Sequence, residues 1–297
     1  MGLDRVEQRI VEAAAVLPSY GGVTGWAALR WLGGRWFEGT DVAGWRLPVT
    51  LATGGLNVRH QPGIRVCKEK LDPRDLIEVD GLRITTAARS VCFEMRYADN
   101  LRLAVRAADM ACFNDLVSTS ELSTYVLAHA AWTGIPRARD ALGLMQENSW
   151  SPAEVDLRLV WTVDAGLGIP LCNVPIFDRA GRHLGTPDLF DPDAGVAVEY
   201  DSSLHLTGFQ RARDVRREEV FRSHGLEYLT SVAADRGDVD ALVARIHATR
   251  ARARWLPESQ RAWTTQAPPW WVRTETVEQR RRLTSGQRSY LLRHRAG

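Results

Sequence analysis

The chain begins with apolar residues at helical spacing. Val6, Ile10 and Val11 recur on one face, which predicts a helix over residues 4–16. Gly21 and Gly22 end that pattern, and a second helix is expected over residues 23–32. Short runs divided by Gly and Pro then predict strands at 47–51 and 64–67.

The next stretch predicts a hairpin and then a largely helical region. Residues 76–84 carry strand-like alternation around Asp80-Gly81, the dipeptide preferred in two-residue hairpin turns. Residues 85–145 are mostly helical in pattern, with Thr85 or Thr86 as the expected cap.

A domain boundary is predicted near residue 148. Ser151, Pro152 and Glu154 form a helix start, with a capping side chain, a proline in the first turn and an acid at the third position. That helix should run to Ala165. The elements expected after it are strands at 171–177, 184–190, 196–200 and 227–231 and helices at 209–224 and 239–252.

The pattern therefore predicts an α/β protein with two domains. Residues 1–148 should form a mixed α+β domain. Residues 149–255 should form an α/β domain with a central mixed sheet flanked by helices, followed at 256–297 by a basic, Trp-containing tail.

Composition limits the class of protein. Hydrophobic residues make up 45% and charged residues 25%, typical of a folded chain, and no apolar run is long enough to span a bilayer. Cys67, Cys92, Cys112 and Cys172 lie too far apart for metal-ligand spacing or a dense disulfide scaffold. We expect reduced thiols and a cytoplasmic location.

The charge of the chain is informative only in local clusters of arginine. The net charge of +2 does not indicate nucleic-acid binding, and lysine occurs only at Lys68 and Lys70. Arginine suits phosphate, although a GC-rich genome also raises its share. Basic runs remain at 211–217, 250–254 and 280–282.

The strand at 196–201 carries the candidate chemistry. Side chains alternate between faces, so Glu199 and Asp201 share one face of an otherwise apolar strand and need a positive partner. Mg²⁺ or Mn²⁺ would supply it through oxygen ligands, with Asp188 from the preceding strand and His205 close in sequence. The alternative is an exposed strand end with solvated acids and His205 in a loop.

These residues resemble a known family. Gly185-Thr186-Pro187-Asp188, the run from Val196 to His205, and the pair Asp214 and Arg217 are similar to the PD-(D/E)XK nuclease superfamily. The similarity is to a branch of actinobacterial proteins that are like very-short-patch repair endonucleases. It covers about a third of the chain. Where that branch usually has glycine after the Glu-x-Asp motif, this chain has Ser202-Ser203.

The resemblance implies roles for the matching residues. Asp188 and Glu199 would bind metal, Asp201 would help to position metal or water, and His205 would act as a base or phosphate contact. Glu154 matches a glutamate on the branch's leading helix. On the helix after the site we expect DNA contacts from Arg213, Arg216 and Arg217.

The first domain carries a second resemblance. Residues 80–91 resemble a segment of type IV abortive-infection antitoxins, whose DNA-binding winged helix precedes it. Only one predicted helix precedes Gly21 here, so operator binding is not expected. Arg89 lies in this segment, and a structural ion pair is the favoured interpretation of it.

Two hypotheses follow. The first is a Mg²⁺-dependent DNA endonuclease of a defence or repair type. The second is a non-catalytic, antitoxin-like DNA-binding regulator with a decayed nuclease fold, and a toxin or other defence-system partner is possible for either. Trp270-Trp271 either stacks on bases or packs on its own domain, and packing is favoured. The sequence leaves the DNA target, strand preference and oligomeric state open.

Overall fold

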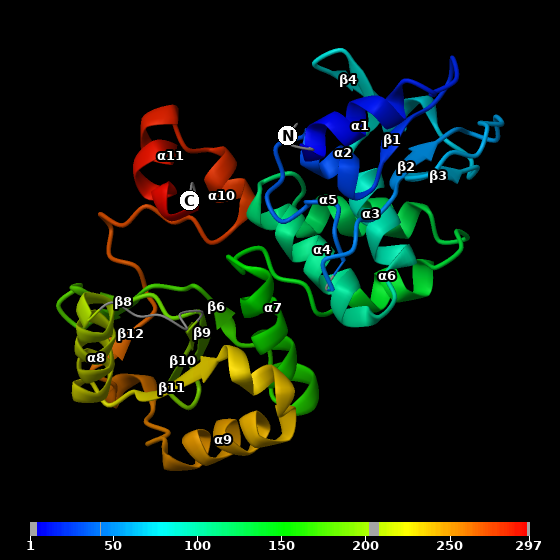
Figure 1. Ribbon diagram of the computed structural model, residues 1–297. Coiled ribbons are helices and arrows are strands. Elements are labelled where there is room, and N and C mark those ends of the chain that lie inside the picture. The colour runs from blue at the N-terminus through cyan, green and yellow to red at the C-terminus, as the bar shows by residue number, and fades with distance from the viewer. Residues whose placement is uncertain (1–4, 42, 202–207, 296–297) are drawn as a thin grey trace. The chain divides into compact units, whose positions relative to one another are not determined.

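The computed structural model describes residues 5–41, 43–201 and 208–295, and for residues 208–214 and 294 it describes the backbone only. The chain divides into two compact units, Met1–Glu147 and Asn148–Gly297 (Figure 1). Each unit is described by itself below. The part of the chain that the structure describes contains no helix long and apolar enough to cross a membrane.

The first unit is a mixed sheet with helices. The strand order is β3-β2-β1-β5-β4, with antiparallel β1–β2 and β4–β5 pairs and parallel β1–β5 and β2–β3 pairs. The helices are α1 (Val6–Ala14), α2 (Trp26–Trp31), η1 (Pro73–Asp75), α3 (Ala87–Tyr97), α4 (Leu101–Phe113), α5 (Thr119–Ala128) and α6 (Ile135–Leu142). The strands are β1 (Gly22–Thr24), β2 (Val49–Ala52), β3 (Ile64–Cys67), β4 (Leu76–Val79) and β5 (Leu82–Thr85).

Local signals predicted most of this unit. The hairpin turn is confirmed, because Asp80 and Gly81 both have positive φ between β4 and β5. Thr86 caps α3 by accepting the N–H of Arg89. The helix expected from residue 23 was placed too early. Gly25, with φ at 65°, separates β1 from α2 and lets the chain turn between them.

The second unit contains two sheets. One has the order β11-β10-β9-β6 and is mixed, since β10 runs parallel to β11 and antiparallel to β9, and the other has the order β12-β7-β8. The helices are α7 (Pro152–Leu159), continued by the π-helical turn η2 (Val160–Asp164), then α8 (Gly208–Ser223), η3 (Ala233–Gly237), α9 (Val239–Arg252), η4 (Glu258–Gln260), α10 (Val277–Arg281), α11 (Ser285–Leu291) and η5 (Arg293–Arg295). The strands are β6 (Leu171–Cys172), β7 (Ile176–Asp178), β8 (His183–Gly185), β9 (Leu189–Asp191), β10 (Val196–Asp201), β11 (Glu227–Val232) and β12 (Trp263–Thr264).

Two expected strands are each divided between the two sheets, which corrects the sequence-based expectation. The stretch 171–177 becomes β6 and β7, because Asn173 takes a positive φ of 48° between them. The stretch 184–190 becomes β8 and β9, and Pro187, which has no N–H for a ladder, lies in the gap. The remaining strands and helices of this unit lie close to their predicted positions.

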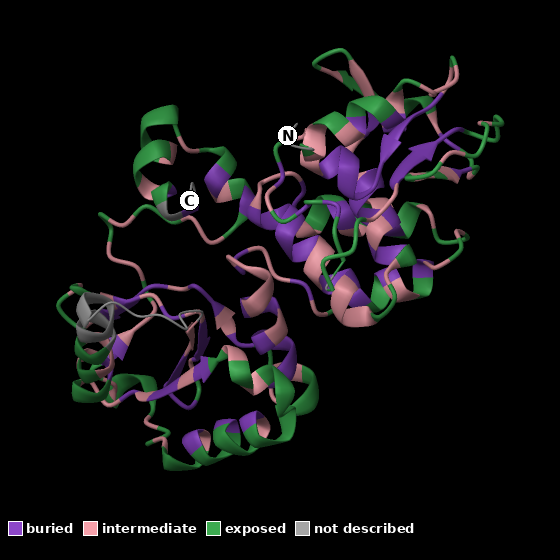
Figure 2. Ribbon diagram, viewed as in Figure 1, coloured by how far each residue is buried: buried purple, intermediate pink, exposed green. Residues whose placement is uncertain are grey.

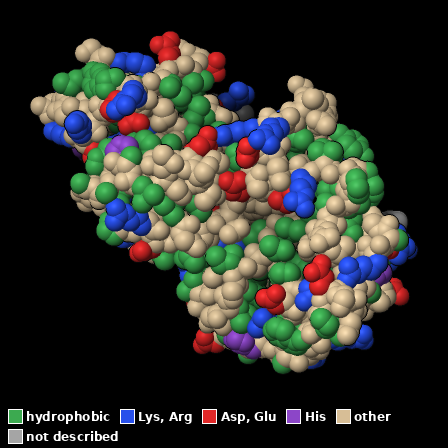
Figure 3. All heavy atoms as spheres, turned by 180° about the vertical axis from the view of Figure 1, so that it is seen from behind, with side chains coloured by type: hydrophobic (Ala, Val, Ile, Leu, Met, Phe, Trp, Pro, Cys, Tyr) green, Lys and Arg blue, Asp and Glu red, His purple; other side chains and the backbone are tan. Residues whose placement is uncertain are grey.

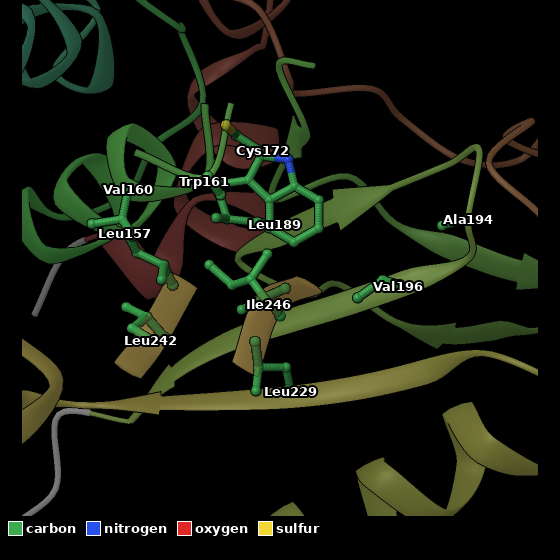
Figure 4. Packing of buried hydrophobic residues seen from close by; sticks show 12 residues of the cluster. Leu157, Val160, Trp161, Cys172, Leu189, Ala194, Val196, Leu229, Leu242 and Ile246 are labelled. Carbon is green, nitrogen blue, oxygen red and sulfur yellow. The ribbon is translucent and has the colours of Figure 1, made fainter. Parts of the chain in front are cut away.

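The central sheet is covered on both faces. On one face, residues of α7, η2 and α9 pack on the strands, including Trp161, Val196 and Ile246 (Figure 4). On the other, Phe221 of α8 packs with Ala197 of β10. In Figure 2 the sheet strands are largely purple, whereas the helices carry green on their outer sides. Each fully buried aliphatic or aromatic side chain contributes roughly 1.5–3 kcal/mol.

The segment that follows residue 255 is part of the second unit. β12 pairs antiparallel with β7, and Trp263 is buried in the same apolar cluster as Phe190 and Phe221. Near the end of the chain, Arg295 donates to the side chain of Asn148. The predicted tail therefore supplies core residues to the α/β unit.

Candidate active site

Asp188 lies just before β9, beside β10. Its Oδ2 atom accepts the backbone N–H of Tyr200 at 2.7 Å. The β9–β10 register pairs Leu189 with Val198, so continuing it sets Asp188 across from Glu199. The Asp188 carboxylate thus accepts a hydrogen bond from the backbone of β10 just beyond the last paired residues of β9 and β10.

Glu154 of α7 lies next to Asp188. Ser151 caps α7, and the buried Glu154 carboxylate accepts three hydrogen bonds. The donors are the N–H of Trp150 at 2.8 Å, the Ser151 hydroxyl at 2.9 Å and Asn173 Nδ2 at 2.7 Å. The N–H of Asn173 also donates to the carbonyl of Asp188. Asn173, which lies between β6 and β7, therefore links Glu154 of α7 to the backbone of Asp188.

The two carboxyl groups perturb each other. Burial and the nearby charge of Glu154 raise the pKa of Asp188 to about 7, against the N–H of Tyr200 and the charge of Arg217. Burial also raises the pKa of Glu154, despite its hydrogen-bond donors. Both shifts favour the protonated form of the carboxyl group.

Glu199 faces the side of the sheet covered by α8. Its Oε1 atom lies 2.8 Å from Arg217 Nε, and its side chain is only 14% exposed. Tyr228 on the parallel neighbour β11 is hydrogen-bonded to the same carboxylate. Burial and the charge of Glu199 raise the pKa of the Tyr228 hydroxyl. Glu199 is therefore held by an arginine and a tyrosine.

Arg217 supplies the positive charge that the acids require. Besides Glu199, it donates through Nη2 to the backbone carbonyl of Thr186, and its charge opposes the raised pKa of Asp188. Gly185 permits this approach of α8, because a Cβ there would lie 2.7 Å from the Phe221 ring. Arg217 therefore pairs with Glu199 and lies close enough to Asp188 for its charge to favour that ionised carboxylate.

The other predicted site residues come from the end of β10, from α8 and from the sequence between them. Asp201 is the partly exposed last residue of β10, in register with Val232 of β11. Arg216 is exposed on α8. His205 lies outside the described residues, and the side chain of Arg213 is likewise not described. The same holds for the side chain of Asp214.

The donor set suits a hard cation. Asp188 and Glu199 offer carboxylate oxygens, and Mg²⁺ is commonly bound through one or two carboxylates with water and phosphate completing its shell. Within residues 5–41, 43–201 and 208–295, no group of three or more His, Cys, Asp or Glu side chains is arranged to hold a metal ion together. A cation shared by Asp188 and Glu199 would therefore have to displace Arg217.

Two residues of this site, Asn173 and Tyr228, were not predicted from the sequence. Asn173 was included in a continuous strand, yet its positive φ and buried side chain let it bridge Glu154 and the Asn148 carbonyl. Tyr228 follows the usual alternation of a strand and gave no sign of contacting Glu199. An asparagine between two short apolar runs was the one available hint, since Asn tolerates positive φ.

Arg89 of the first unit is a structural ion pair, as favoured from the sequence. Its fully buried guanidinium bonds to Glu69 at 2.9 Å and lies 4.6 Å from the Trp132 ring centroid. Arg96 bonds to the same carboxylate and also stacks on Trp132. Despite burial, hydrogen bonds from Arg96 and Tyr97 and the charges of the two arginines lower the pKa of Glu69 to about 2.

Several arginines of the basic runs pair with acids. Arg250 pairs with Asp191, Arg252 with Glu227, and Arg282 with Glu278. On the face drawn in Figure 3, basic and acidic side chains are interspersed among neutral ones.

The comparisons with known proteins give no relative. No protein-family model, curated protein or solved structure matches this chain.

Proposed function

We propose that the second unit is a Mg²⁺-dependent DNA endonuclease of a defence or repair type. The observation that supports this most is the position of Asp188 beside Glu154 and across from Glu199, where β9 begins and β10 ends, with Arg217 paired to Glu199. Acids brought together against their own repulsion are typical of sites that bind a cation or transfer a proton.

The roles follow from the contacts. Asp188 and Glu199 would hold Mg²⁺ or Mn²⁺, which supplies Lewis-acid stabilisation of charge on the phosphate. Asn173 and Tyr200 orient Glu154 and Asp188 through the hydrogen bonds described above. Arg217, released from Glu199, would bind a phosphate oxygen.

A non-catalytic, antitoxin-like DNA-binding regulator is the second candidate. The Arg217–Glu199 ion pair favours it, because the pair neutralises Glu199 with no cation. In that case the acids and the arginine are a structural network, and any toxin or other defence partner would act elsewhere on the chain.

Cleavage is tested directly with supercoiled plasmid. The purified chain should nick or linearise it with Mg²⁺ or Mn²⁺ and stop with EDTA. Glu199→Gln should abolish cleavage. Glu227→Gln is the matched control, since Glu227 lies at the other end of the neighbouring strand β11 and is also paired with arginines. Equal cleavage by both variants would reject the site.

Metal binding is tested without knowing the DNA target. Mg²⁺ or Mn²⁺ should raise the Tm of the wild type and of Glu227→Gln by mass action, and that of Glu199→Gln much less. A wild type whose Tm does not respond to either metal, and which does not cleave plasmid, would favour the regulator.

A further inference from the structure

Trp270 is a large apolar residue held out in solvent. It is 64% exposed, whereas its neighbour Trp271 packs at 5.0 Å from both the Phe177 and His183 rings, measured between ring centroids. Packing is thus confirmed for Trp271. Trp270 meets Phe177 and Trp271 edge-on at centroid distances of 6.3 and 5.7 Å, which leaves much of its indole open.

The backbone that carries this exposed ring is held in a turn. The N–H of Trp271 donates to the carbonyl of Pro268 at 2.9 Å, so Pro269 and Trp270 are the central residues of a β-turn. Proline at the second position fixes its own φ. A rigidly presented aromatic ring loses little conformational entropy when a ligand stacks on it.

The turn is connected to the candidate active site. His183, under Trp271, shares a 3.0 Å hydrogen bond with the Thr186 hydroxyl. The Thr186 carbonyl in turn accepts from Arg217, the partner of Glu199. A series of contacts through the side chain and backbone of Thr186 therefore leads from the tryptophan turn to Glu199.

Two arginines near the Pro268–Trp271 turn indicate what kind of ligand would bind to Trp270. Gly181 approaches Pro268, and next to it the side chain of Arg182 is 72% exposed, with its Nε atom paired to Asp178 at 3.1 Å. Arg273 is exposed beyond Trp271. An aromatic face flanked by arginines suits a nucleic-acid strand, which offers bases for stacking and phosphates for the guanidinium groups. Bases inside a duplex are already stacked and paired, so the ring can take only an unpaired base.

We propose that Trp270 is the stacking platform for an unpaired nucleobase of the substrate strand whose backbone reaches Arg217 and Glu199. This proposal rests on the proposed nuclease function and specifies the class of DNA that would be its substrate. The substrate carries unpaired nucleotides beside the phosphate that is cleaved, as in a single strand, a flap, an overhang or a locally unpaired region of a supercoiled plasmid.

The test compares Trp270→Ala with the wild type in fluorescence-anisotropy titrations at one fixed salt concentration and with EDTA. The probes are a fluorescein-labelled single-stranded oligodeoxynucleotide and its blunt duplex. One lost stacking contact is worth about 1–3 kcal/mol, so single-strand affinity should fall roughly 5- to 150-fold, with duplex affinity unchanged. Trp270→Phe should retain most of the affinity.

Trp255→Ala is the matched control, because Trp255 is 50% exposed on the same unit but stacks on Arg250. It should bind single strands like the wild type, and both Ala variants should keep the wild-type circular dichroism spectrum. Equal losses on single strand and duplex, equal losses in both Ala variants, or no single-strand binding by the wild type would overturn the platform.

The two proposals fail separately. Trp270-dependent binding of single strands without metal-dependent cleavage would reject the nuclease and retain the platform. Plasmid cleavage by the wild type together with unchanged single-strand affinity in Trp270→Ala would retain the nuclease and reject the platform.

Discussion

Replacing Asp188 with asparagine should stabilise the metal-free protein above neutral pH. The wild-type carboxyl has a pKa of about 7 when folded, against 3.8 for an ordinary Asp. The asparagine amide keeps an oxygen that can accept the N–H of Tyr200 but carries no charge beside Glu154. The variant therefore removes the repulsion while it preserves the hydrogen bond.

The direction with pH follows from proton linkage. Below about pH 4 the Asp188 carboxyl group is protonated in both the folded and the unfolded state. The contribution of its raised pKa to the free energy of unfolding is then fully present. Between about pH 4 and pH 7 only the folded state keeps the proton, so the free energy of unfolding falls as pH rises. A pKa difference of about three between the two states corresponds to about 4 kcal/mol. Because Asp188 is partly exposed, solvent screening reduces this to about 2–4 kcal/mol.

The assay is urea unfolding with EDTA at about pH 4.5 and about pH 8. Asp188→Asn should lie within about 1 kcal/mol of the wild type at the lower pH and exceed its free energy of unfolding by about 2–4 kcal/mol at the higher. Asp178→Asn is the control with the opposite sign, because the N–H of Arg182 lowers the pKa of Asp178. If Asp188→Asn destabilises the protein equally at both pH values, Asp188 is an ordinary ionised carboxylate and the reasoning fails.

Further predictions concern α8 and its contacts. Arg217→Ala should enlarge the Mg²⁺-induced rise in Tm, because the guanidinium that competes with the metal for Glu199 is removed. Arg222→Ala, on the same helix, should leave this rise unchanged. An unchanged rise in both variants would show that Arg217 does not compete with the metal. Gly185→Ala should cost about 1–3 kcal/mol in urea unfolding, because the new Cβ would press on the Phe221 ring. Gly237→Ala, which meets open space, should change stability by less than about 0.5 kcal/mol; equal costs would refute the steric argument.

The acidic face of β10 was predictable because it depends on alternation alone. Glu199 lies on the face that the strand pattern gave it, and the capping signals at Ser151 and Thr86 were also correct. The identity of the positive partner was not predictable in the same way. The sequence suggested a metal, whereas Arg217 meets Glu199 because α8 packs on β8 at Gly185.

What the sequence by itself determined is local. Helix spacing, the Asp80-Gly81 turn and the apolar alternation of β10 involve residues within a few positions of each other, where backbone sterics and burial act directly. Only the tertiary structure decided which sheet each short strand joined, and that Asn173 would lie between Glu154 and Asp188. Those outcomes depend on packing between segments far apart in the chain, and a single sequence has no local signal for them.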